Sequence, residues 1–336
     1  MRSTDPLWPV LLRSCLSLIA FTLAHSAMGT EPREQELTFQ ALNGIPVKPS
    51  DTDREITAFN NPHYVYVDRD IVVAHDARAP ADRHELLLFI PGTNGTGKGA
   101  VRFCQLAARY GYHVIFLMYP DDVPASICRD DPDPNAFRDF RMAIITGGKT
   151  SQIAVSRTDS IENRLIKLLM HLKRIRPRED WGQFLTASGE LKWSSFAVAG
   201  QSQGGGHAAL IGVTHLVARV IGTGAPKDYS VALNRPAQWY SQVSATPKDR
   251  FFFFNHQQDH QGCTPEQCLE NVEALGLGKF GHLVDVDRST YPYQHSHNLT
   301  TDYPGGKLES KKAHTTVIAD KNAALFERVW LYMLTE

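Results

Sequence analysis

The stretch Val198–Gly206, VAGQSQGGG, decides which fold this 336-residue chain is expected to adopt. Within it, Gly200 to Gly204 matches the pattern G-x-S-x-G, in which a serine is held on a sharp turn between a strand and a helix. The glycines are needed because side chains two residues on either side of the serine would collide as the strand folds back. A strand-like run at 195–199 precedes the motif and a helix-like stretch at 205–215 follows it. This context favours a serine presented at a strand-to-helix turn.

A second glycine-rich stretch, PGTNGTGKG at Pro91–Gly99, follows the apolar run Leu86–Ile90. Backbone N–H groups after a buried strand can bind either a phosphate or the oxyanion of an acyl-transfer reaction. Gly92 to Lys98 fits the first seven positions of a P-loop, but the eighth position, which should be Ser or Thr, is Gly99. A P-loop nucleotide enzyme therefore remains a minor alternative.

The whole chain alternates between strand-like and helix-like runs, which is typical of an α/β fold with a mainly parallel sheet. Strands are expected at 64–67, 71–73, 86–90, 113–118, 195–199, 217–222, 250–254 and 282–286. Helices are expected at 98–110, 161–175, 205–215 and 315–334, the second of them capped by Asp159 or Ser160. Because no Gly/Ser-rich linker divides the chain, we expect a polar N-terminal segment at 28–60 and one domain at 61–336 with an insertion at 119–193.

From about residue 60 to 334 the chain resembles the α/β-hydrolase family, specifically its serine esterases and lipases. The resemblance rests on VAGQSQGGG, on LLLFIPGTNG at 86–95, and on an acid and a histidine that follow the serine in that order. It implies a mostly parallel sheet of about eight strands with helices on both faces. It also implies hydrolysis of a carboxylic ester through an acyl-serine intermediate, with no cofactor and no metal.

By this resemblance Ser202 is the expected nucleophile and Asp259 the expected acid of a Ser-His-Asp triad. Asp259 lies in the loop after the run Phe251–Phe254, where the family places its acid, and Asp228 in the preceding loop is the main competitor. His314 is the expected base because it comes just before the last expected helix.

Two further histidines, His295 and His297, also follow the last expected strand and stay open as alternatives. For the oxyanion hole, the family implies one backbone donor at Gln203 and a second in the glycine-rich loop, at Thr93 with Asn94 as the alternative. The loop begins Pro91-Gly92 where the family often has His-Gly, so the second donor is left open.

The N-terminus has the pattern of a signal peptide at 1–27: basic residues, the apolar run Cys15–Ala24 and then small residues. The run is about ten residues, too short to span a bilayer. We therefore expect a secreted or periplasmic protein without an integral membrane span in its mature chain. Four cysteines remain after cleavage, and the pairs Cys263–Cys268 and Cys104–Cys128 are expected if disulfides form.

Charge and histidine content limit the partners. The formal net charge is −1, without any block of five like charges, so neither nucleic acid nor a polybasic membrane contact is indicated. Six of the 14 histidines fall within 256–314, which keeps a zinc hydrolase open. A catalytically inactive hydrolase fold used as a binding module is another alternative. The segment 119–157 is either a lid or a surface excursion.

Overall fold

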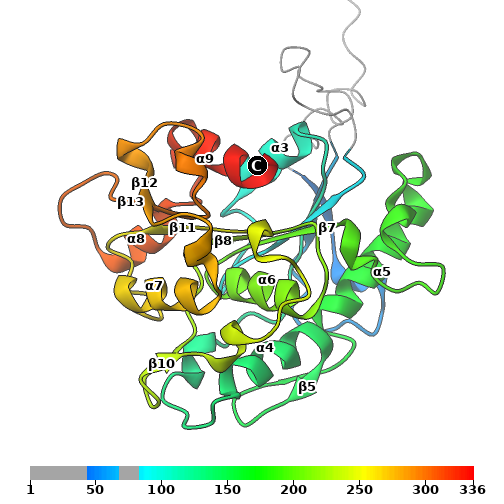
Figure 1. Ribbon diagram of the computed structural model, residues 1–336. Helices are drawn as coiled ribbons and strands as arrows, with labels where there is room; N and C mark the ends of the chain where they lie inside the picture. Colours follow the sequence, from blue (N-terminus) through cyan, green and yellow to red (C-terminus); the bar gives the residue numbers. More distant parts are fainter. Residues whose placement is uncertain (1–43, 68–82) are drawn as a thin grey trace, which may run out of the picture.

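A central sheet of nine strands organises the computed structural model, which describes residues 44–67 and 83–336 (Figure 1). Seven neighbouring strands run parallel, and two antiparallel strands close one edge. The prediction of a mostly parallel sheet is confirmed, with nine strands instead of about eight. In sheet order the strands are β1 (Ile45–Val47), β2 (His63–Tyr66), β4 (His113–Phe116), β3 (Leu86–Ile90), β7 (Phe196–Gln201), β8 (Arg219–Thr223), β11 (Phe251–His256), β13 (Asn298–Thr301) and β12 (Val284–Asp285).

The central strands are apolar throughout because both faces of the sheet are covered. In β3, Leu86, Leu88 and Ile90 pack into the hydrophobic cluster on one face. The residues between them, Leu87 and Phe89, pack into the cluster on the other face. A strand buried on both faces has a continuous apolar run instead of the alternating apolar and polar residues of a half-exposed strand. The sequence therefore predicted β3 correctly.

Helices cover both faces of the sheet, as expected. In Figure 1, α3 and α9 lie above the sheet, while α4, α5 and α6 lie below it. The helices are α2 (Pro49–Thr52), α3 (Val101–Arg109), α4 (Ala136–Thr146), α5 (Ile161–Ile175), α6 (Gln203–Thr214), α7 (Pro265–Ala274), α8 (Ser310–Thr316) and α9 (Ala323–Thr335). Two short hairpins, β5 (Gly148–Lys149) with β6 (Ala154–Val155) and β9 (Tyr229–Ser230) with β10 (Arg235–Pro236), lie outside the sheet.

Several element boundaries differ from expectation. The last expected helix, 315–334, is two helices, α8 and α9, with residues 317–322 between them. Strand β13 was not expected, and it comes after His295 and His297, so of the three candidate histidines only His314 follows the last strand. The expected strand at 71–73 and the signal peptide at 1–27 lie outside the described residues.

The insertion after β4 is a folded part of the molecule. It contributes α4 and α5, whose apolar residues join the same hydrophobic cluster as the sheet. Ser160 caps α5 by accepting a hydrogen bond from the Asn163 amide at 3.3 Å, which confirms one of the two expected caps. Residues of α4, within the segment at 119–157, are buried in this cluster, so the segment is more than a surface excursion.

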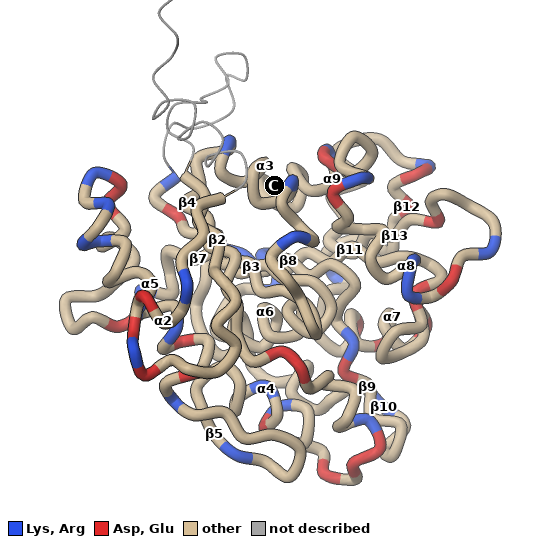
Figure 2. The backbone as a smooth tube through the Cα atoms, turned by 180° about the vertical axis from the view of Figure 1, so that it is seen from behind, with Lys and Arg blue, Asp and Glu red and all other residues tan. Residues whose placement is uncertain are grey.

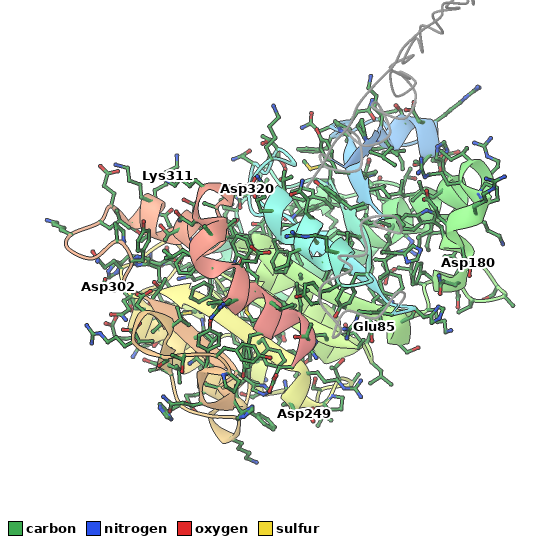
Figure 3. All side chains as sticks on the ribbon, turned by 90° about the horizontal axis from the view of Figure 1, so that it is seen from above. Glu85, Asp180, Asp249, Asp302, Lys311 and Asp320 are labelled. Carbon is green, nitrogen blue, oxygen red and sulfur yellow. The ribbon has the colours of Figure 1, made fainter. Side chains whose placement is uncertain are left out.

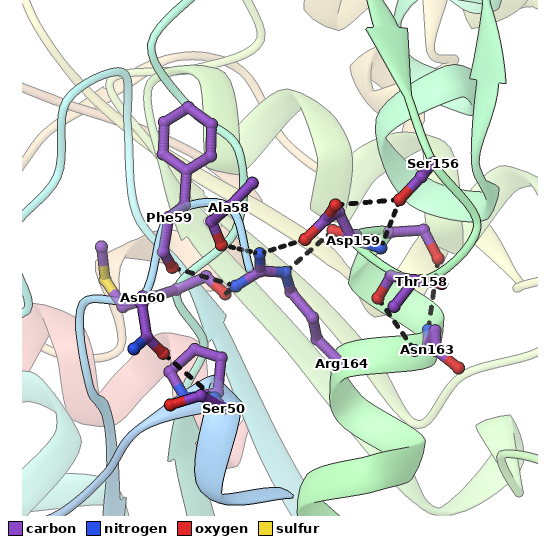
Figure 4. Close-up of polar contacts among 12 residues, drawn as sticks. Ser50, Ala58, Phe59, Asn60, Ser156, Thr158, Asp159, Asn163 and Arg164 are labelled. Carbon is purple, nitrogen blue, oxygen red and sulfur yellow. Dashed lines mark hydrogen bonds and ion pairs between the residues drawn. The ribbon is translucent and has the colours of Figure 1, made fainter. Parts of the chain in front are cut away.

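The buried Arg164 of α5 fastens the N-terminal segment to the rest of the fold (Figure 4). Its guanidinium donates to the main-chain oxygens of Ala58 at 2.5 Å and Phe59 at 3.1 Å. The same side chain forms an ion pair with Asp159 at 2.8 Å. A charge buried this deeply is tolerated because it is paired and its donors are satisfied.

The structure corrects the expected disulfides. The described cysteines Cys104, Cys128, Cys263 and Cys268 are all buried and free. Cys104 packs in the cluster on one face of the sheet and Cys128 in the cluster on the other face, so the sheet separates them. Cys263 and Cys268 pack in one small cluster with Tyr229 and their thiols are hydrogen-bonded, yet they are not joined.

Charged residues of both signs are interspersed over the face shown in Figure 2. This distribution agrees with the formal net charge of −1. Across residues 44–67 and 83–336, none of the helices combines the length and the apolar character needed to cross a bilayer.

Candidate active site

Ser202 lies on the turn between β7 and α6 with φ of 56° and ψ of −119°, a conformation that non-glycine residues rarely adopt. The glycines on either side are required by close packing. A Cβ atom at Gly200 would lie 2.3 Å from the carbonyl carbon of Gly204, and one at Gly204 would lie 1.9 Å from the oxygen of Ile90. The turn is therefore locked between strand β3 and its own helix, which presents the serine at the carboxyl edge of the sheet.

His314 and Asp259 meet at the same edge although 55 residues separate them. Asp259 lies in the loop after β11, and His314 lies within α8 instead of just before the last helix. Their closest atoms, His314 Nδ1 and Asp259 Oδ2, are 2.7 Å apart. An ionised carboxylate only accepts hydrogen bonds, so the proton of a neutral imidazole lies on Nδ1 and Nε2 is left as an acceptor.

The Asp259 carboxylate is almost completely buried and is held by three donors. Besides His314, the Lys227 ammonium lies 3.0 Å from Oδ2, and the amide of Gln261 donates to Oδ1 at 2.9 Å. Burial alone would raise the pKa of Asp259, but the hydrogen bond from His314 and the charge of Lys227 hold it below its usual value. Asp259 is thus an ionised acceptor at neutral pH.

Asp228, the competing acid, has a different partner. Its carboxylate accepts two hydrogen bonds from Arg141 of α4, at 2.6 Å from Nε and 2.5 Å from Nη2, and one from Trp239 Nε1 at 3.1 Å. Both members of the pair are buried, and Arg141 also donates to the main-chain oxygen of Gln203 at 2.8 Å. Asp228 therefore supports the turn that carries Ser202, and among the described residues no histidine is hydrogen-bonded to it.

The Gln203 side chain ties the loops around the serine together. Its Oε1 accepts from the Thr93 hydroxyl at 3.1 Å and from the Ala125 amide at 2.7 Å, and its Nε2 donates to the Val123 oxygen at 3.1 Å. The Asn94 amide already donates to the Asp121 oxygen at 3.0 Å. Within the described part of the chain, the main-chain N–H of Thr93 has no acceptor. This geometry favours Thr93 over Asn94 as the second donor.

A cleft of about 440 Å³ lies at this edge and contains both Ser202 and His314. The insertion contributes Pro124, Ala125, Ser126 and Arg141 to its wall. The other lining residues are Thr93, Gln201, Gln203, Lys227, Asp228, Gln261, Gly262, Lys311 and Thr315. Most of these residues have polar side chains, but the exposed surface of the wall is mainly apolar, and the volume suits a small molecule or one end of a larger one.

The glycine-rich loop at 91–99 does not have the surroundings of a phosphate site. In a P-loop the following helix directs its first amides at a phosphate. Here the N-terminus of α3 is occupied by the Asp320 carboxylate, which accepts from the Arg102 amide at 2.8 Å. Asp320 is labelled in Figure 3, where the C-terminal part of the chain meets α3. A carboxylate at this position repels the phosphate that a nucleotide would place there.

Three of the six histidines at 256–314 make separate structural contacts. His256 Nε2 contacts the Tyr303 oxygen at 2.9 Å, and His295 Nδ1 contacts Glu336 at 2.8 Å. His297 stacks on Phe252 with ring centroids 4.2 Å apart. In the described ranges, no three His, Cys, Asp or Glu side chains are grouped closely enough to hold a metal ion. These three histidines therefore do not form one site.

Two residues of the site, Arg141 and Lys227, were not anticipated from the sequence. Arg141 lies in the middle of the unexpected helix α4, and the sequence held no sign that a partner stood 87 residues further on. For Lys227 the only sign was its place in the loop after β8, directly before Asp228.

The chain was also compared with known protein families, curated proteins and solved structures. No family model and no curated protein matches the chain. An esterase from the Planctomycetes species Thermogutta terrifontis with propionate bound is 12% identical, covers 87% of this chain and 92% of its own, and has a TM-score of 0.43. An α/β hydrolase from a Medee basin deep-sea metagenome library is 16% identical over 81% of this chain and 92% of its own, with a TM-score of 0.38. At such scores the function has to be argued from the site itself.

Proposed function

We propose that the protein is a serine hydrolase that cleaves a carboxylic ester through an acyl-Ser202 intermediate. The observation that carries the proposal is the 2.7 Å contact between His314 Nδ1 and the buried Asp259 carboxylate, on a histidine that lines the same cleft as Ser202. A serine on a strained turn, a histidine in the correct tautomer and a buried acid are the three parts that this chemistry requires.

In the proposed reaction, Ser202 Oγ attacks the ester carbonyl carbon while His314 Nε2 accepts the hydroxyl proton. Asp259 holds the imidazole through Nδ1–H and stabilises the imidazolium that forms. The carbonyl oxygen becomes negatively charged and accepts hydrogen bonds from the main-chain N–H groups of Gln203 and Thr93. His314 then returns the proton to the leaving alcohol. In the second half, water attacks the acyl carbon while His314 Nε2 accepts its proton, and that proton passes to Ser202 Oγ as the carboxylic acid leaves.

Fluorophosphonate labelling of the mature protein tests the proposal directly, because the probe reacts with activated serines. Wild type and Ser202→Ala are compared on the same day with hydrolysis of p-nitrophenyl acetate and butyrate. We expect labelling and turnover in the wild type and neither in the variant. A folded wild type that is not labelled would instead support the inactive binding module. Turnover without labelling that a chelator abolishes would support a metal hydrolase.

We also infer export from the cytoplasm, on the apolar run Cys15–Ala24 and the small residues after it. N-terminal sequencing of protein recovered from outside the cytoplasm should begin near residue 28. Recovery of the intact chain from the cytoplasmic fraction alone would contradict this inference.

A further inference from the structure

Lys227 is a buried lysine that none of the proposed catalytic steps uses. It lies in the loop after β8 and keeps only 9% of its surface exposed. Its ammonium lies 3.0 Å from Asp259 Oδ2 and 3.4 Å from the Asp259 main-chain oxygen. A lysine is rarely buried unless an interaction offsets the cost of removing its charge from water, so its position next to the proposed acid needs an explanation.

The geometry shows that one carboxylate oxygen serves two partners. Asp259 Oδ2 faces both His314 Nδ1 at 2.7 Å and Lys227 Nζ at 3.0 Å, while Oδ1 accepts the Gln261 amide. The carboxylate therefore cannot rotate without losing two charge-assisted contacts at once. The ammonium also neutralises part of the negative charge that would otherwise act on the imidazole.

We propose that Lys227 is a positioning residue that fixes the Asp259 carboxylate and weakens its pull on the His314 proton, so that the enzyme stays active at lower pH. The inference rests on the proposed function. Burial would lower the pKa of Lys227, but the neighbouring Cys268 and Asp259 raise it, which keeps the ammonium charged. The other charged and titratable groups near this contact are Cys263, Cys268, His260, Lys311, Arg141 and Asp228.

None of these other groups replaces Lys227 in this role. Arg141 is engaged with Asp228 and the Gln203 oxygen. Lys311 is exposed on α8, and the thiols of Cys263 and Cys268 carry no positive charge in either protonation state. Lys227 is thus the one cation within 4 Å of Asp259 among the described residues, apart from His314 itself when protonated.

The test measures kcat/KM for p-nitrophenyl acetate from pH 4.5 to pH 9 in wild type, Lys227→Met, Lys227→Gln and Lys227→Arg. Removing a charge that shares Asp259 Oδ2 with the imidazole should move the acid limb of the profile upward by roughly one pH unit in the Met and Gln variants. The Arg variant should keep the limb within about 0.3 unit, because it restores the charge. Lys312→Met removes an exposed charge from the same helix as His314 and serves as the control, with an unchanged limb.

Failure of this inference is separable from failure of the proposed function. If the wild type turns over substrate in a Ser202-dependent manner but folded Lys227→Met and Lys227→Gln keep the wild-type limb, the role of Lys227 is refuted and the hydrolase stands. A wild type without Ser202-dependent turnover refutes the hydrolase, and this inference with it. The Gln variant keeps a donor and the side-chain volume, so the test remains decisive if the Met variant does not fold.

Discussion

Replacing Asp228 with Asn distinguishes the two aspartates that compete for the role of triad acid. The Asp228 carboxylate is 1% exposed and accepts two donors of Arg141 and one of Trp239. The side-chain amide of the new asparagine keeps one acceptor oxygen but directs its NH2 group at the guanidinium. Arg141 is then a buried charge without a counter-ion. Breaking a buried pair in this way costs about 3–5 kcal/mol of unfolding free energy, or about 10 °C in Tm.

Asp228→Asn should therefore lose mainly stability, whereas Asp259→Asn should lose mainly activity. We expect Asp228→Asn to be markedly less stable in urea unfolding, while its folded fraction at 15 °C keeps kcat for p-nitrophenyl acetate within about tenfold of wild type, since Arg141 also supports the Gln203 carbonyl. Asp259→Asn should lower kcat by about 10⁴-fold because the imidazole loses the acceptor that fixes its tautomer. A folded Asp228→Asn with a 10⁴-fold loss, beside an Asp259→Asn of near wild-type activity, would reverse the assignment.

Three further predictions address the surroundings of the site. His207 is fully buried, both its ring nitrogens lack a partner among the described residues, and burial with a nearby guanidinium holds its pKa well below the usual value. Folding thus favours the neutral imidazole, so its contribution to the free energy of unfolding is fully present above pH 6.5 and is lost as the pH falls. His207→Phe should therefore reduce the slope of the unfolding free energy against pH, between pH 6 and pH 4, by about 1.4 kcal/mol per pH unit, as measured by urea unfolding. An unchanged slope would contradict the burial of a neutral ring. Gly204→Ala should abolish soluble expression or lower stability by more than about 3 kcal/mol, because its Cβ would lie 1.9 Å from a main-chain oxygen, whereas Gly99→Ala, with nothing within 4 Å, should stay within about 0.5 kcal/mol. Gln203→Leu removes the side-chain contacts that join the serine turn to Thr93, Val123 and Ala125 and should lower kcat about 100-fold. Thr93→Val keeps its main-chain N–H and should stay within about tenfold; a loss equal to that of Gln203→Leu would show that the Thr93 hydroxyl is required.

The parts of the fold that the sequence predicted are those specified by local patterns. Strand β3 is buried on both faces and is therefore a continuous apolar run, and the turn at Ser202 has glycines where packing leaves no room for a Cβ atom. Helix α5 combines apolar spacing with Ser160 at its start. In each case the physical constraint lies within a few residues of the pattern that reports it.

The elements that were missed owe their stability to distant partners. Strand β13, NLTT, is buried between β11 and β12 but has three polar residues, so no apolar run marks it. Helix α4 has Arg141 on its buried side, which interrupts the apolar spacing that identifies a helix. The Asp228 carboxylate, 87 residues away, and the main-chain oxygen of Gln203 stabilise the buried guanidinium, and no short window along the sequence contains these partners together with Arg141.

The choice between Asp228 and Asp259 shows the same limit at the site. Both aspartates follow a strand of the parallel sheet, so their sequence contexts are equivalent, and each proves to be a buried carboxylate with a cationic partner. What separates them is the next contact: Arg141 occupies all the acceptor positions that face it on Asp228, whereas Lys227 leaves Asp259 Oδ2 able to accept from His314 as well. A bidentate guanidinium engages both oxygens of a carboxylate, whereas an ammonium makes one contact. With Trp239 as a third donor, Asp228 is surrounded by donors other than a histidine, whereas the lysine at Asp259 leaves room for His314.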